Sequence, residues 1–113
     1  TASYENMRGT TWYVAPEVAH GAEPTAASDV WSLAITVLEL LNGELPWTAA
    51  ERCHNNEVMF LRQLGGKDST LVPTIPEKTG IPDDLISMLR KCLQRDPALR
   101  PSCEDLLNSD FAL

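Results

Sequence analysis

Residues 28–41, SDVWSLAITVLELL, set the architecture of this 113-residue chain. From residue 29 to residue 41, nine of thirteen residues are apolar. The four others are Asp29, Ser32, Thr36 and Glu39. Successive helical residues lie about 100° apart, so these four share one narrow stripe and the remaining circumference is apolar. The pattern predicts a helix over about 29–41 that is buried nearly all round, with Ser28 or Asp29 as N-cap and Gly43 just past its end. A membrane span is not expected, because the run is short and holds two carboxylates.

The size and charge of the chain limit its class. A length of 113 residues suits one domain or part of one, and a first residue of Thr rather than Met indicates a piece of a longer chain or a processed product. No basic N-terminal region precedes an apolar stretch, so neither a signal peptide nor a transmembrane segment is expected. Nine basic and sixteen acidic side chains give a net charge of −7, which disfavours nucleic acid and anionic membrane as partners.

The cysteines and histidines form no recognisable metal or disulfide pattern. Cys53, Cys92 and Cys103 are an odd number, and they lack metal-ligand spacing to each other or to His20 and His54. Cys92 and Cys103 lie within apolar helical patterns. We therefore expect them to be reduced core thiols of an intracellular, cytoplasmic protein, and we expect no metal site.

One isolated carboxylate precedes the central helix. Residues 12–18, WYVAPEV, form a short apolar run in which Pro16 suits the first turn of a helix. Glu17 stands among apolar neighbours, where a carboxylate is more often exposed than buried. If Glu17 is buried, it needs a cationic partner.

The next part of the chain reads as a short helix and a long loop. Trp47 is an apolar anchor directly after the turn that follows the central helix. Residues 56–64, NEVMFLRQL, are amphipathic and are followed by the helix-terminating pair Gly65 and Gly66. Residues 67–81 show no sustained period and are expected to form a loop. The apolar residues that tie this loop down are expected to be Leu71, Val72 and Ile75.

Two further helices are expected at the C-terminal end. Pro82, followed by two aspartates, opens a helix that Asp96 and Pro97 stop. Ser102 and Asp105 have capping-box spacing for a last helix. The side chains of that helix expected to point inward are Leu106 and Leu107. No strand is convincing, so the fold class is mainly α.

Three motifs together resemble the eukaryotic protein kinase family. Residues 9–18, GTTWYVAPEV, resemble the end of its activation segment with the Ala-Pro-Glu signature. Residues 28–47, SDVWSLAITVLELLNGELPW, are similar to the F helix of the kinase C-lobe and its continuation. Residues 89–102, LRKCLQRDPALRPS, are similar to the segment that joins the H and I helices. The resemblance implies that residues 1–113 are part of a kinase domain, the C-terminal portion of its helical lobe from the activation segment onward.

The resemblance implies roles for five residues. Arg100 matches the arginine that pairs with the Ala-Pro-Glu glutamate, here Glu17. Asp29 matches the aspartate that anchors the catalytic loop, although a helix cap remains an alternative. Gly9 and Thr10 match the P+1 loop that positions the substrate, and a threonine there is typical of serine/threonine kinases.

The resemblance also points to modification sites and to small departures. Thr1, Ser3 and Tyr4 lie where activation-loop phosphorylation occurs in the family, while an ordinary polar loop is the alternative. Ala34 stands where the F helix commonly has glycine, and Thr11 stands where many relatives have proline. The residues of 28–47 and 57–64 are most similar to the branch that contains the MAP-kinase-kinase-kinases.

The parts of a kinase that perform phosphoryl transfer do not occur in this chain. The sequence contains no glycine-rich loop, no catalytic-loop aspartate and no Asp-Phe-Gly. The complete kinase is expected to use ATP and Mg²⁺, with no catalytic residue and no cofactor ligand among residues 1–113. The piece alone is expected to be inactive and of marginal stability.

A second hypothesis is a pseudokinase or a non-catalytic docking module. The first hypothesis implies a protein substrate, and either implies an upstream kinase or another docking partner. The residues expected to contact such a partner are Trp47, Val58, Met59, Phe60 and Leu61.

Overall fold

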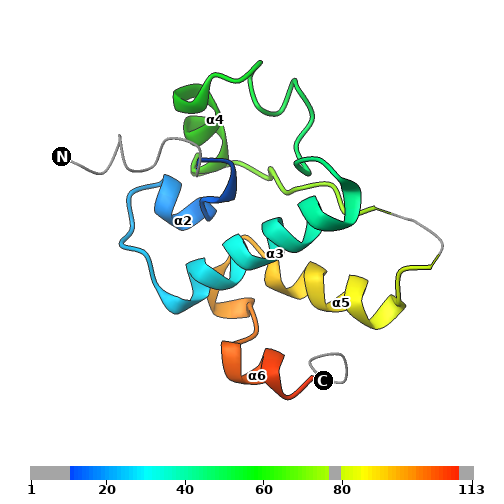
Figure 1. The fold of residues 1–113 in the computed structure, drawn as a ribbon. Coiled ribbons are helices and arrows are strands. Elements are labelled where there is room, and N and C mark those ends of the chain that lie inside the picture. The colour runs from blue at the N-terminus through cyan, green and yellow to red at the C-terminus, as the bar shows by residue number, and fades with distance from the viewer. Residues whose placement is uncertain (1–10, 77–79, 110–113) are drawn as a thin grey trace.

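The computed structural model describes residues 11–76 and 80–109, which form short helices joined by ordered loops (Figure 1). The helices are η1 (Thr11–Tyr13), α2 (Pro16–Ala19), α3 (Ala26–Asn42), α4 (Glu57–Leu64), α5 (Asp83–Cys92), η2 (Pro97–Leu99) and α6 (Cys103–Leu107). No strand occurs in these ranges, in agreement with the expected mainly α class. None of the helices in the described ranges is long and apolar enough to cross a bilayer.

The central helix α3 begins earlier than predicted. Thr25 is the N-cap: its side chain accepts a hydrogen bond from the backbone N–H of Ser28, and the Ser28 Oγ accepts one from the Thr25 N–H. This reciprocal capping box satisfies the helix start one turn before Asp29, so the prediction of Ser28 or Asp29 as N-cap is wrong. Gly43 ends the helix in the left-handed conformation at φ 75°, as predicted.

Helix α3 lies across the middle of the molecule with α5 along one side and η1 on another (Figure 1). Its buried side chains include Trp31, Ile35 and Leu38, each fully covered. Leu33 and Leu40 are 52% and 78% exposed, so the prediction of burial nearly all round is wrong. These two residues are seven positions apart and share a face of α3 that stays largely exposed among the described residues.

Helix α4 packs its inner side against α2 and η1. Phe60 and Leu64 are fully buried, and the ring of Phe60 meets the rings of Trp12 and Trp47 edge-on at centroid distances of 4.9 and 5.1 Å. Gly65, the residue directly after α4, lies against the backbone of α2. A Cβ added to it would stand 2.6 Å from the carbonyl carbon of Ala19. A residue with a side chain would therefore push α4 away from α2.

The predicted boundaries of α5 and α6 are close to the observed ones. Asp83 and Asp84 lie in the first turn of α5, and the predicted capping box between Ser102 and Asp105 starts α6.

Three predictions of inward-facing side chains in this part of the chain are wrong. Cys103 is exposed and Leu107 is 75% exposed, because the five-residue α6 lies at the edge of the molecule and packs through Leu106 instead. In the loop, Leu71 packs against the core, whereas Val72 is 47% exposed.

Candidate functional site

A buried ion pair joins the two ends of the described chain. The Arg100 Nη1 and Nη2 atoms donate to the two carboxylate oxygens of Glu17, each at 2.7 Å. The side chain of Arg100 is fully buried, and that of Glu17 is 16% exposed. Two parallel charge-assisted hydrogen bonds fix both planar groups, so α2 cannot rotate freely against the scaffold. The structure therefore contains the ion pair that the resemblance implied.

Every remaining N–H of the Arg100 guanidinium also has an acceptor. The Nε atom donates to the Gln94 carbonyl at 2.8 Å, Nη1 to Ala27 at 3.0 Å and Nη2 to Arg95 at 3.2 Å. With the two bonds to Glu17, all five donors of the group are satisfied. The face of the guanidinium lies over the ring of Trp31 at 5.2 Å. Arg100 thus connects α2, the start of α3 and the loop after α5, and a smaller cation could not make the same set of contacts.

Helix α3 also holds the segment directly before α2. The Ser32 hydroxyl donates to the Tyr13 carbonyl at 2.7 Å, and the Tyr13 hydroxyl donates to Glu39 at 2.5 Å. The hydrogen bond to Glu39, together with burial, raises the pKa of Tyr13. Sequence reasoning treated Ser32 and Glu39 as part of a polar stripe and missed this role. Their spacing of seven residues, which is two helical turns on one side, is the signal that could have shown it.

A cluster of aromatic side chains holds η1 from the other side. The Trp47 indole N–H donates to the Trp12 carbonyl at 2.9 Å, and Trp47 is 3% exposed. Phe60 lies between the two tryptophans. Trp47 and Phe60 are therefore interior residues, and the prediction that they offer a docking surface is wrong. Of the other residues in that prediction, Val58 and Met59 are 47% and 42% exposed, while Leu61 is half-buried.

Asp29 lies in the first turn of α3 and is exposed. It borders a hollow of about 390 Å³ whose other walls include Tyr13, Val18 and Pro24. Its carboxylate has no hydrogen-bond or ion-pair partner among the described residues. An exposed carboxylate at the rim of a mainly apolar hollow can accept N–H bonds from a further segment.

The other predicted site residues cannot be placed, because they lie outside the ranges that the structure describes. Thr1, Ser3, Tyr4, Gly9 and Thr10 lie outside the described residues. The Nδ1 atom of His20 lies 2.6 Å from the carbonyl oxygen of Gly65. Within residues 11–76 and 80–109, no group of three His, Cys, Asp or Glu side chains could hold a metal ion.

A second arginine, Arg95, supports the site. The sequence patterns did not predict this role. The Arg95 Nη1 atom donates to the Leu71 carbonyl at 2.6 Å, and Nη2 donates to the carbonyl of Leu64. Burial lowers the pKa of Arg95, and the nearby Arg100 acts in the same direction. Arg95 therefore ties the end of α4 and the following loop to the turn that carries Arg100.

Together these contacts define a helical scaffold in which the central helix, Trp47 and Arg100 fix a short segment ending in Ala-Pro-Glu. This is the arrangement expected for the substrate-side lobe of a protein kinase. The model of the protein kinase domain family matches residues 1–112, so the chain belongs to that family.

Three of the curated relatives are named as mitogen-activated protein kinase kinase kinases. The chain is 34% identical over 107 residues to mitogen-activated protein kinase kinase kinase 2 of Arabidopsis thaliana, covering 95% of this chain and 15% of that protein. It is 34% identical over 105 residues to mitogen-activated protein kinase kinase kinase 20 of the same plant, covering 93% and 29%. It is 36% identical over 106 residues to human mitogen-activated protein kinase kinase kinase 4, covering 91% and 6%. The chain thus spans less than a third of the length of each of these relatives.

Proposed function

We propose that this chain is part of a serine/threonine protein kinase, which transfers the γ-phosphate of ATP to serine and threonine hydroxyls of a protein substrate. The family match over residues 1–112 supports the proposal. The three relatives described above support it further, because each of them is named as a mitogen-activated protein kinase kinase kinase. Those names describe enzymes whose substrate is itself a protein kinase, and we propose the same substrate class here.

The observation that carries the proposal is the double hydrogen bond between Arg100 and Glu17. In a kinase, the segment before the Ala-Pro-Glu glutamate presents the substrate platform, which we assign to Gly9 and Thr10. A platform positions a peptide only if its own backbone is fixed. The ion pair fixes that segment on its C-terminal side, and we assign Asp29 the role of anchoring the catalytic loop.

The cofactors of the reaction would be ATP and Mg²⁺. The part of the chain that the structure describes offers no cluster of three potential metal ligands, so it does not fit a magnesium site. The sequence lacks the glycine-rich loop, the catalytic-loop aspartate and the Asp-Phe-Gly motif, so we expect no phosphotransfer from residues 1–113 alone. Candidate sites of activating phosphorylation are Thr1, Ser3 and Tyr4.

The alternative is a non-catalytic docking module. The exposure of Val58 and Met59 on the outer side of α4 favours it. Apolar side chains on an exposed helix face are a common mark of protein contact.

The test is a phosphotransfer assay on the complete protein that contains this chain. Purified protein is mixed with radiolabelled ATP, Mg²⁺ and peptides that carry serine, threonine or tyrosine as their single hydroxyl. We expect label in the serine and threonine peptides, strongly reduced by Glu17→Gln. Glu23→Gln, in the exposed loop before α3, is the matched control and should retain the activity. No label in any peptide would contradict the kinase assignment and favour the docking module.

A further inference from the structure

Beside the aromatic cluster lies a hollow with an unpaired arginine. The hollow measures about 320 Å³ and lies between the end of α3, the turn at residues 46–52 and the loop at residues 74–76. Its walls include Pro46, Trp47, Thr48, Arg52 and Thr74. It is distinct from the hollow beside Asp29, and its lining includes two prolines, two threonines, one carboxylate and one guanidinium.

Arg52 lacks the partners that a half-buried guanidinium normally has. Its Nε atom is buried and makes no hydrogen bond, and no carboxylate of the described residues forms an ion pair with it. A buried donor without a partner destabilises the folded protein by about 1–3 kcal/mol, and more where the group is charged. Such a group persists where a ligand can complete it, and an arginine is suited to a carboxylate through two parallel hydrogen bonds.

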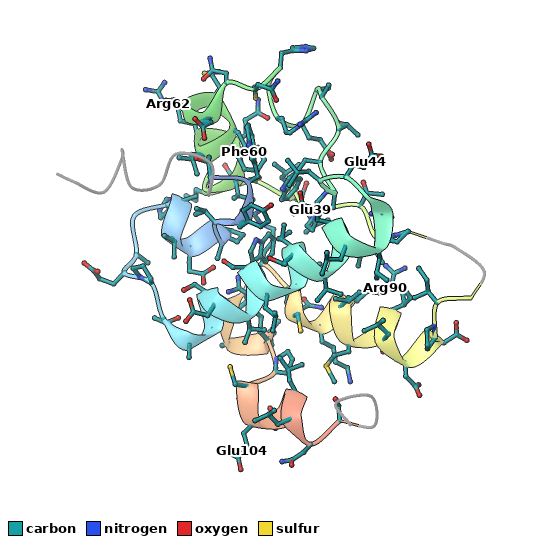
Figure 2. The ribbon with its side chains drawn as sticks, in the orientation of Figure 1. Glu39, Glu44, Phe60, Arg62, Arg90 and Glu104 are labelled. Carbon is teal, nitrogen blue, oxygen red and sulfur yellow. The ribbon has the colours of Figure 1, made fainter. Side chains whose placement is uncertain are left out.

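The two carboxylates nearest along the chain do not fill this role. The Oε1 atom of Glu51 accepts the backbone N–H of Thr48 at 2.8 Å and is used in that capping turn. Glu44 borders the same hollow but is exposed, and no ion pair joins it to Arg52. Figure 2 labels it near the end of α3. Arg52 is therefore the cation of the hollow without a counter-ion.

The position of Arg52 is fixed by η1. Its guanidinium carbon lies over the ring of Trp12, 6.0 Å from the centroid. Trp12 is itself held by the indole N–H of Trp47 and by the edge of Phe60. Because the stack holds one face of the guanidinium, its N–H groups are left to meet a ligand in the plane of the group.

Arg52 contacts Trp12, which stands two residues after Thr10 in the sequence. We propose that Arg52 is a specificity-determining residue that binds one acidic side chain, Asp or Glu, of the protein substrate. The proposal rests on the proposed function and deepens it, because it names the chemistry that the platform selects. The net charge of −7 opposes a strongly acidic partner, so the preference concerns a single position of the substrate.

The test compares the activity of one kinase on two peptides, and then compares that ratio between the wild type and its variants. The complete kinase is assayed on serine peptides in which Asp, or Asn as the neutral isostere, is moved one position at a time across both sides of the serine. At one position, kcat/KM should favour Asp over Asn by about three- to tenfold, which corresponds to a partly shielded charge pair. Arg52→Gln should reduce that ratio to about one, and Arg52→Lys should retain part of it.

The ratio separates recognition from stability, because a weakened fold lowers the activity toward both peptides equally. Arg62→Gln is the matched control: Arg62 is exposed on the outer side of α4, whereas Phe60 is on the inner side (Figure 2). This variant should keep the ratio of the wild type. An active kinase with no Asp preference at any position, or with a preference that survives Arg52→Gln, would overturn the role of Arg52 and leave the kinase assignment intact. A wild-type protein without any phosphotransfer would instead overturn the proposed function and this role with it.

Discussion

Arg100 and Glu17 lie 83 positions apart in the sequence and are joined by two hydrogen bonds of 2.7 Å. The guanidinium is fully buried, so water does not stabilise its charge. The Glu17 carboxylate and three backbone carbonyls stabilise it instead. A buried charge with one partner missing is strongly unfavourable. The fold therefore depends on both ends of the described chain being present together.

Tyr13→Phe should destabilise the protein. The substitution removes the hydrogen bond from the Tyr13 hydroxyl to the Glu39 carboxylate and leaves the ring in place. Hydrogen bonds to charged groups contribute about 1.5–3 kcal/mol, so the free energy of unfolding in urea should fall by about that much. Thr36→Val, which removes an exposed hydroxyl from the same helix, is the control and should have a much smaller effect. A Tyr13→Phe protein as stable as the wild type would show that Tyr13 does not hold η1 to α3.

Gly65→Ala should separate α4 from α2. The new Cβ would lie 2.6 Å from the Ala19 carbonyl carbon and 2.7 Å from the His20 nitrogen, which are backbone atoms that cannot move alone. Overpacking of this kind typically costs about 1–3 kcal/mol, measurable as a lower midpoint of thermal unfolding. At Gly66 the nearest atom would be 3.3 Å away, so Gly66→Ala should have a clearly smaller effect. Equal effects of the two substitutions would contradict the close contact.

The free energy of unfolding should fall at alkaline pH because the buried thiol of Cys92 loses its proton there. Burial raises the pKa of its thiol from 9.0 to about 11, so the folded state keeps a proton that the unfolded state releases. The stabilising contribution is complete below pH 9.0 and is lost as the pH rises toward about 11. Urea unfolding at about pH 8 and about pH 10.5 should show a larger loss for the wild type than for Cys92→Ala. The raised pKa of Tyr13 acts in the same direction but is present in both proteins. An equal loss in both would contradict the role of Cys92.

Most helix ends could be predicted from the sequence, because capping and termination involve residues only a few positions apart. Gly43 ends α3, the acidic pair opens α5 and Ser102 caps α6 through interactions within a few residues. The N-cap of α3 was misplaced because Thr25, Ser28 and Asp29 are all suitable cap residues, and only the backbone decides among them. Burial was predicted less well. Leu33, Leu107 and Cys103 fit apolar helical patterns, but their exposure depends on which faces other elements cover.

The site was predicted only where a charge lacked a local partner. Glu17 among apolar neighbours needed a cationic partner only if it was buried, and the resemblance implied that this partner is Arg100. The bonds from Arg95 to Leu64 and Leu71 end on backbone carbonyls, which every residue possesses, so no sequence pattern marks them. The unpaired state of Arg52 is likewise a property of the assembled structure.

The most direct test of the account is a double-mutant cycle on the buried ion pair. The free energy of unfolding in urea is measured on the complete protein that contains this chain, for the wild type, Glu17→Ala, Arg100→Ala and the double variant. Each single substitution should cost about 3–5 kcal/mol, and the double should cost little more than one of them, giving a coupling energy of about 2–4 kcal/mol. Single effects that add to within about 0.5 kcal/mol would show that the two residues act independently, which contradicts the claim that they hold the fold together.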